Sequence, residues 1–200
     1  MVCGNRTMDP RVTELHCIMP IANIASVLQH GLLSHERASQ LQHLSVAMQA
    51  MKDRRNIKTV PGGLRLHQYA NLYFHARNPM LSVRRNEDVC VLRVSTQVLG
   101  VNGAVITDQN AASDYVRFYA PHQWKLLDFN DIFARDWTHP GEQIREWRHK
   151  SRKCAEVLVP HQVPPNMITG AYVVDEPAHA RLNQVGFALP SVVDPDFFFR

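Results

Sequence analysis

One carboxylate in this chain sits where a side chain of that type is costly. In the stretch RKCAEVLVP the alternation of side chains predicts a strand that carries Glu156 between Cys154 and Leu158 on one face. A glutamate on an apolar face is rarely buried without a partner or a chemical task. Glu156 therefore either faces solvent from an edge strand or lies in a cleft where it takes part in chemistry.

Two further polar side chains interrupt apolar segments and are weaker candidates. His16 lies in LHCIM and Tyr73 in NLYFHARNP, and each type is more often a packed core residue than a ligand-binding one. The sequence contains no Walker loop, no G-x-G-x-x-G, no G-x-S-x-G and no H-E-x-x-H. Its eleven histidines show no zinc-type spacing, so we expect no metal.

The positive charges are clustered, although the net charge is only +4. Basic runs occur at 52–58, at Arg84 and Arg85, and at 145–153, the last of which runs into the Glu156 strand. Such runs favour a polyanion near Glu156, or they are solvated faces of surface helices.

Length and composition predict one compact domain over residues 1–200. The chain has 45% hydrophobic and 20% charged residues, with no repeat and no Gly/Ser linker. Its four cysteines lack paired spacing, which favours a reduced, cytoplasmic protein. The N-terminus has no apolar signal core and no run of eighteen apolar residues occurs, so we expect no association with a membrane.

The pattern of elements predicts an α+β fold. Strands are expected at 12–19, 69–76, 88–95, 153–159 and 170–175. Helices are expected within 20–33, ending at Gly31, and at 39–52, 112–119, 140–150 and 177–185. Because strands and helices alternate irregularly, a regular parallel α/β fold is disfavoured.

Four motifs together resemble the DarT family of DNA ADP-ribosyltransferases, the toxins of DarT–DarG toxin–antitoxin systems. They are KDRRN at 52–56, VPGGLRLHQYANLYFHARNPML at 60–81, ITDQNAASDYVRFY at 106–119 and RKCAEVLVP at 152–160. The resemblance implies an ADP-ribosyltransferase fold with central sheets flanked by helices. It also implies NAD+ as substrate, a base of single-stranded DNA as acceptor, and an antitoxin that contains a macrodomain.

The same resemblance assigns roles to residues. Glu156 and Arg55 are the implied catalytic residues. Those implied to bind NAD+ are His16, Met19, Asn23, His67, Tyr69 and Tyr73. For DNA we expect Tyr115, Arg117, Tyr119, Arg152 and Lys153, because aromatic and basic side chains together bind single strands. The aromatic residues among them are equally compatible with closing a helix onto the sheet.

The chain departs from the family pattern at three positions. Ala76 and Asn78 stand where relatives have proline and serine, and Tyr115 stands where they have histidine. The target base, thymine or guanine, is left open by the sequence. An acceptor other than DNA, such as RNA or protein, and plain NAD+ hydrolysis would use the same Glu156. A nucleic-acid-binding module without catalysis would not need it.

Overall fold

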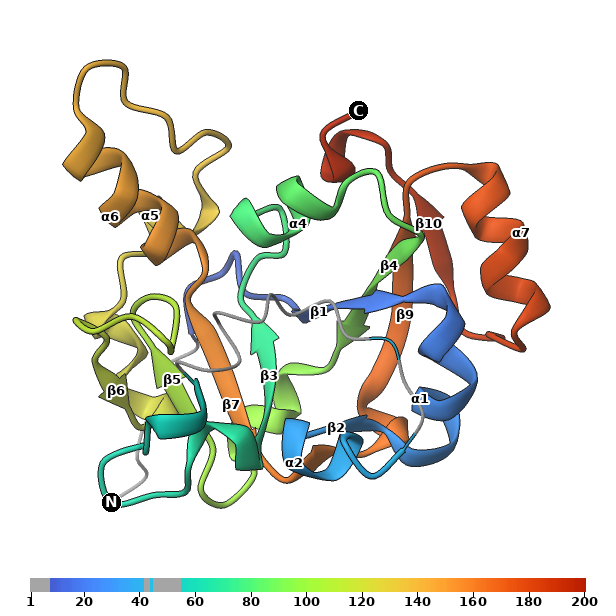
Figure 1. Cartoon of the computed structure of the whole chain (residues 1–200), viewed down its shortest axis with the longest axis horizontal. Coiled ribbons are helices and arrows are strands. Elements are labelled where there is room, and N and C mark those ends of the chain that lie inside the picture. Colours follow the sequence, from blue (N-terminus) through green and yellow to red (C-terminus); the bar gives the residue numbers. More distant parts are fainter. Residues whose placement is uncertain (1–7, 42–43, 45–54) are drawn as a thin grey trace.

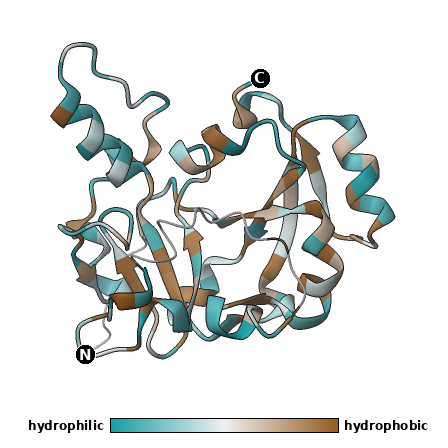
Figure 2. Ribbon diagram, viewed as in Figure 1, coloured by the Kyte–Doolittle hydropathy of each residue, from teal (hydrophilic) through white to brown (hydrophobic). Residues whose placement is uncertain are grey.

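The computed structural model describes residues 8–41, 44 and 55–200. The helix expected at 39–52 falls mostly outside the described residues, and the short helix expected within 20–33 is present and ends at Gly31. Figure 1 shows one large twisted sheet with helices around it, and Figure 2 shows that hydrophobic residues are concentrated in its strands. The α+β prediction is confirmed.

The sheet has eight strands and is mixed. In spatial order they are β10 (Ser191–Val193), β9 (Ile168–Val173), β4 (Val89–Val94), β1 (Leu15–Pro20), β3 (Tyr69–Tyr73), β7 (Glu156–Pro160), β5 (Val105–Thr107) and β6 (Phe118–Tyr119). Neighbours are antiparallel except β9 and β10, which are parallel. A second sheet joins β2 (Leu32–Leu33) to β8 (Gln162–Val163).

The large sheet divides between β1 and β3. These two strands pair at a single position, His16 with Tyr73, whereas β1 pairs with β4 at six positions and β3 with β7 at five. The two halves of the sheet therefore separate beyond this point, as Figure 1 shows for β1 and β3. Space for a ligand opens where backbone pairing stops.

Short helices surround the two halves. The α-helices are α1 (Ile24–His30), α2 (His35–Ala38), α4 (Pro79–Arg84), α5 (Phe129–Phe133), α6 (Gln143–Lys153) and α7 (Glu176–Gln184). The 3-10 helices are η1 (Ile21–Asn23), η2 (Leu66–Gln68), η3 (Thr96–Gly100), η4 (Pro121–Leu126), η5 (Pro165–Met167) and η6 (Asp196–Phe198). In the part of the chain that is described, none of them could cross a membrane.

Asn78, one of the departures from the family pattern, caps helix α4. Its side-chain oxygen accepts hydrogen bonds from the backbone N–H of Met80 at 2.9 Å and of Leu81 at 3.1 Å, and Pro79 occupies the first helical position. Asparagine and serine are both strong N-cap residues, so the exchange of one for the other preserves this turn.

Two of the sequence predictions are wrong in detail. The strand expected at 153–159 begins only at Glu156, because helix α6 continues through Lys153. The helix expected at 112–119 is absent, and this stretch forms turns followed by β6. There the backbone is held by contacts with distant residues, which override local helix propensity.

Burial of Phe74 directly after β3 supplies a test of the core. Its side chain is fully buried and meets the Phe129 ring edge to face at 5.5 Å. We expect Phe74→Ala to lower the free energy of unfolding by about 3–5 kcal/mol, because it removes that contact and leaves a cavity. The measurement is urea unfolding. Val83→Ala, at an exposed position of α4, should change the free energy of unfolding by less than about 0.5 kcal/mol. Equal losses of stability in the two variants would contradict this account of the core.

Candidate active site

Glu156 is a buried residue of a central strand. Strand β7 has β3 on one side and β5 on the other, so it is not an edge strand, and Glu156 is only 1% exposed. The reading in which this carboxylate faces solvent from a sheet edge is therefore excluded.

The buried carboxylate has two partners from distant parts of the chain. Arg55 Nη1 donates to Oε2 at 2.9 Å and to Oε1 at 3.2 Å, and the Ala111 backbone N–H donates to Oε1 at 3.0 Å. The Arg55 side chain is 14% exposed. A buried charge is tolerated when it is paired and hydrogen-bonded in this way. The two residues that were predicted to be catalytic are thus in direct contact.

Loop 108–117 is fixed beside Glu156. The Thr107 hydroxyl accepts from the Glu156 backbone N–H at 2.9 Å and donates to the Gln109 carbonyl at 2.7 Å. From the other side, Lys58 Nζ donates to the carbonyls of Ala112 and Ser113. These bonds place the loop that contains Tyr115 next to the buried ion pair.

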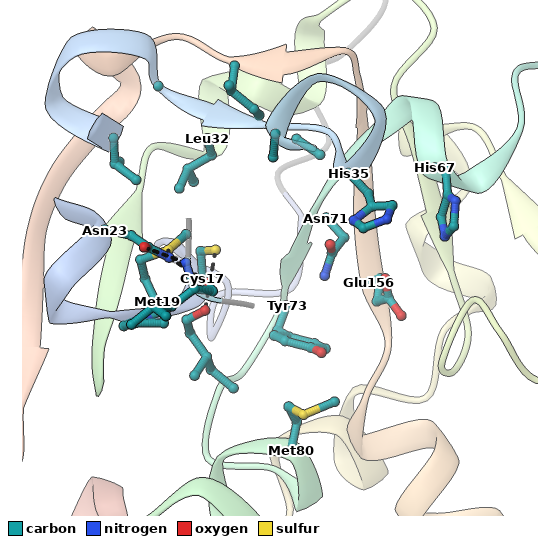
Figure 3. Close-up of a pocket in the computed structure, with 18 of the residues that line it drawn as sticks. Cys17, Met19, Asn23, Leu32, His35, His67, Asn71, Tyr73, Met80 and Glu156 are labelled. Atoms are coloured by element: carbon teal, nitrogen blue, oxygen red, sulfur yellow. Dashed lines mark hydrogen bonds between the residues drawn. The ribbon is translucent and has the colours of Figure 1, made fainter. Parts of the chain in front are cut away.

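A cavity of about 210 Å³ adjoins the ion pair where the sheet divides. Six of the predicted site residues line it: Met19, Asn23, Arg55, His67, Tyr73 and Glu156. Figure 3 shows Tyr73 and Glu156 on neighbouring strands, with Cys17 and Met19 across the cavity. The other lining side chains are mostly apolar, which suits the planar rings of a nucleotide.

Tyr73 and Asn23 contribute to the cavity in different ways. Tyr73 lies directly opposite Glu156 in the β3–β7 pair, and burial together with the Glu156 charge raises the pKa of its phenol well above the usual value. The side-chain amide of Asn23 instead hydrogen-bonds the backbone of Leu44: Nδ2 donates to the Leu44 carbonyl at 2.6 Å, and Oδ1 accepts from the Leu44 N–H at 2.9 Å. Asn23 thereby holds residue 44 at the rim.

His16 and Tyr69, which were also predicted to bind NAD+, do not line this cavity. The His16 ring is buried among His75, Tyr172 and Phe197. The Tyr69 hydroxyl accepts from the Leu64 N–H at 3.1 Å and packs beneath the turn at 60–63. In this structure both support the walls rather than reach the space between them.

The residues predicted to bind DNA separate into exposed and buried ones. Tyr115 is 88% exposed, Arg117 is exposed, and Tyr119 is half-buried against the core. Arg152 is exposed on α6.

Lys153 is fully buried, so the structure does not place it for contact with DNA. Its Nζ donates to the carbonyls of Ile132 at 2.8 Å and Ala134 at 2.7 Å, and burial, with Arg77 nearby, lowers its pKa to about 8. Lys153 thus stabilises the end of α5.

Sequence reasoning missed the groups that orient Glu156. Thr107 and Lys58 act on backbone atoms, and the Ala111 contribution is itself a backbone N–H, so residue types give no signal for them. Asn71, which lines the cavity, was detectable, because it is a polar residue on the same face of its strand as Tyr73. In the described part of the chain, no group of three or more His, Cys, Asp or Glu side chains is placed to hold a metal ion.

Comparison with known proteins agrees with this geometry. The fold matches solved ADP-ribosyltransferases: "Thermosipho africanus DarTG in complex with ADP-ribose" at TM-score 0.79 and 27% identity, and "Thermus sp. 2.9 DarT in complex with ADP-ribosylated ssDNA" at TM-score 0.77 and 26% identity. The matches cover 93% and 96% of this chain, and 51% and 98% of those chains. The chain therefore has the fold of the ADP-ribosyltransferase class.

The family follows from the sequence comparison. The family model described as "ssDNA thymidine ADP-ribosyltransferase, DarT" matches residues 16–199, so the chain belongs to the DarT family. A Thermosipho africanus protein, "DNA ADP-ribosyl transferase-DNA ADP-ribosyl glycohydrolase fusion protein", is 32% identical over 96% of this chain. This chain spans about half of that relative, 51% of its length.

The hydrogen bonds around Glu14 should make a contribution to stability that depends on pH. Burial opposes ionisation of Glu14, but hydrogen bonds from His16, Arg93 and Tyr172 outweigh it and lower the pKa from 4.5 to about 2. Because the folded-state pKa is depressed, this stabilisation is present above about pH 4.5 and is lost as the pH falls toward 2. We expect Glu14→Gln to lower stability by about 1–3 kcal/mol at pH 7.

The difference between wild type and Glu14→Gln should shrink between pH 4.5 and 2. Urea unfolding at several pH values measures it, with Glu142→Gln, in an exposed ion pair, as the matched control. A difference that stays constant with pH would rule out the charged network.

Proposed function

We propose that this chain transfers ADP-ribose from NAD+ to thymidine in single-stranded DNA and acts as the toxin of a toxin–antitoxin pair. The observation that carries the proposal is the buried Arg55–Glu156 ion pair at the wall of an apolar cavity, in a chain of the DarT family. One similar solved protein holds ADP-ribose and another holds ADP-ribosylated single-stranded DNA.

Residues of the cavity have the chemistry that NAD+ requires. Arg55 Nη2 is buried and has no hydrogen-bond partner among the described residues, so one guanidinium donor is available to a ligand. A planar, permanently charged fork suits the pyrophosphate of NAD+ or the phosphate of the acceptor. Met19, Tyr73 and His67 line the cavity, and we assign to them the surfaces against which the rings of NAD+ pack, with Tyr73 stacking on the nicotinamide.

Glu156 is the group suited to the chemical step. Cleavage of the bond between nicotinamide and ribose develops positive charge at the anomeric carbon, and a nearby carboxylate stabilises that charge. Nicotinamide leaves with the bonding electron pair. In thymidine, N1 of the base is bonded to the sugar and N3 carries the one remaining N–H, so a new N3–C bond forms as Glu156 accepts the N3 proton. The number of protons and electrons is unchanged by this exchange.

The acceptor enters as a single strand, because the N3 edge of thymine is paired inside a duplex and extrusion costs a few kcal/mol. Tyr115 and Arg117 project from loop 108–117 beside Glu156, which suits stacking on a base and contact with a phosphate. Tyr119, half-buried behind them, supports the loop, and Arg152 adds positive charge nearby.

A macrodomain antitoxin of the DarG type is the proposed protein partner. The Thermosipho relative joins a transferase and a glycohydrolase in one chain, which supports a pairing of the two activities here. We also propose that residues 1–200 act as a single transferase domain and that the reaction occurs in the cytoplasm, where its DNA substrate lies.

Substitution of Glu156 and Arg55 tests the reaction. We expect Glu156→Gln to lower the rate of transfer by about 10²–10⁴-fold, because an amide cannot accept the N3 proton. Arg55→Lys should lower it by at least about tenfold, because lysine lacks the planar fork. The measurement is the intact mass of mixed-sequence single-stranded oligonucleotides after incubation with NAD+, where the product gains one ADP-ribose unit.

Glu87→Gln, which changes an exposed carboxylate outside the cavity lining, is the matched control and should react as wild type. Thermal unfolding of each variant separates loss of chemistry from loss of fold. Consumption of NAD+ without modified DNA would replace the proposal by hydrolysis or by another acceptor. If NAD+ is not consumed and DNA still binds, the chain is a binding module.

Tyr115 provides a separate test of the acceptor side. We expect Tyr115→Ala to raise the KM for DNA by about fivefold or more, because a stacking surface is lost, while the KM for NAD+ stays unchanged. Tyr115→Phe should remain close to wild type. Steady-state transfer to a thymidine-containing oligonucleotide measures both constants. Equal effects on the two KM values would place Tyr115 in the NAD+ site instead.

A further inference from the structure

The outer face of helix α6 is not used by the reaction described above. Ile144 and Trp147 lie one helical turn apart on it and are 65% and 60% exposed. Figure 1 shows α6 beside α5, projecting from the part of the sheet that contains β7 and β5. Two large apolar side chains that remain this exposed on one helix face indicate a surface that meets a partner.

The orientation of α6 is fixed by its inner face. His149 and Lys153 are buried, and His149 Nε2 lies 3.2 Å from the Asp131 carbonyl while Lys153 binds the end of α5. Residues three and four apart share a helix face, so Ile144, Trp147 and Arg148 form one patch on the side away from α5. The patch is presented by a packed helix rather than by a loose one.

Two more arginines extend the positive charge of this patch beyond Arg148. Arg145, Arg148 and Arg152 follow each other along the helix at spacings of three and four residues. Arg145 pairs with Glu142 and Arg152 with Asp131, whereas Arg148 is exposed and makes no ion pair with any described residue. A partner must therefore offer flat apolar surfaces between negative charges. Bases separated by phosphates in a single strand meet this requirement.

The patch is close enough to the reaction centre to bind the same strand. Helix α6 ends at Lys153, three residues before Glu156. Trp147 is six residues from that end, which is about 9 Å along the helix, and the three following residues add at most about 10 Å. At about 3.4 Å per nucleotide of a stacked strand, the separation corresponds to at most about six nucleotides.

We propose that this α6 face, formed by Ile144, Arg145, Trp147, Arg148 and Arg152, binds the DNA that flanks the target base. Trp147 stacks on a flanking base and Arg148 contacts a phosphate. The inference rests on the proposed function, since it gives the transferred base a second point of attachment on the same strand. It also predicts that substrate length matters beyond the target nucleotide.

Oligonucleotide length tests the proposal. Wild type should show a KM for a 16-nucleotide strand about tenfold below that for a 4-nucleotide strand with the same central thymidine. We expect Trp147→Ala and Arg148→Glu to remove most of this advantage while leaving the 4-nucleotide reaction unchanged. Trp147→Phe should keep it and Trp147→Leu should lose it, because leucine is apolar but does not stack. Arg148→Glu should also reduce the slope of log binding constant against log salt by about 0.7.

The matched control is Arg181→Glu on α7, an exposed arginine at the opposite end of the molecule, which should behave as wild type. An unchanged length dependence in Trp147→Ala and Arg148→Glu would overturn the proposal. So would a wild-type response of Trp147→Leu, which would indicate an apolar protein contact, or an equal rise of KM for both strand lengths. If wild type modifies no DNA, the proposed function fails, and fluorescence anisotropy of the same strands with the same variants still decides whether this face binds them.

Discussion

The buried ion pair between Arg55 and Glu156 is the constraint on which the rest of the site depends. A carboxylate that is 1% exposed would cost several kcal/mol to desolvate without a cation and hydrogen-bond donors. The fold supplies the cation from Arg55, which precedes β3 in the chain, and a backbone N–H from Ala111 in loop 108–117. Thr107 and Lys58 then hold that loop in place. Much of the architecture around β7 is explained by the need to keep one charge buried and oriented.

A row of side chains crosses the sheet at the level of this charge. Arg93, His16, Tyr73 and Glu156 are directly paired from strand to strand, so all four lie on one face. The charges at the two ends of the row are each neutralised locally, Arg93 by Glu14 and Glu156 by Arg55. Between them the sheet separates, and the ligand cavity forms beside Tyr73.

The sequence was most informative where one residue conflicted with its surroundings. Glu156 was recognisable because it interrupts an apolar strand, and strand periodicity placed most of the sheet correctly. Arg55 gave no local signal, because its partner lies 101 residues away, and only the family resemblance pointed to it. His16 was expected in the cavity, but strand periodicity does not reveal where β1 leaves β3. Lys153 was expected at the surface, since a lysine that binds carbonyls looks the same in sequence as a solvated one.

The 101-residue separation within the ion pair also governs when the site can exist. As the chain leaves the ribosome, Arg55 and the cavity wall in β1 and β3 appear early, but β7 must insert between β3 and β5 before Glu156 meets its partners. Contacts between residues so far apart in the chain form late, because closing the intervening loop costs conformational entropy before the contact can stabilise the fold. A partly synthesised chain therefore has no assembled site until β7, which ends at Pro160, has been made and has joined the sheet.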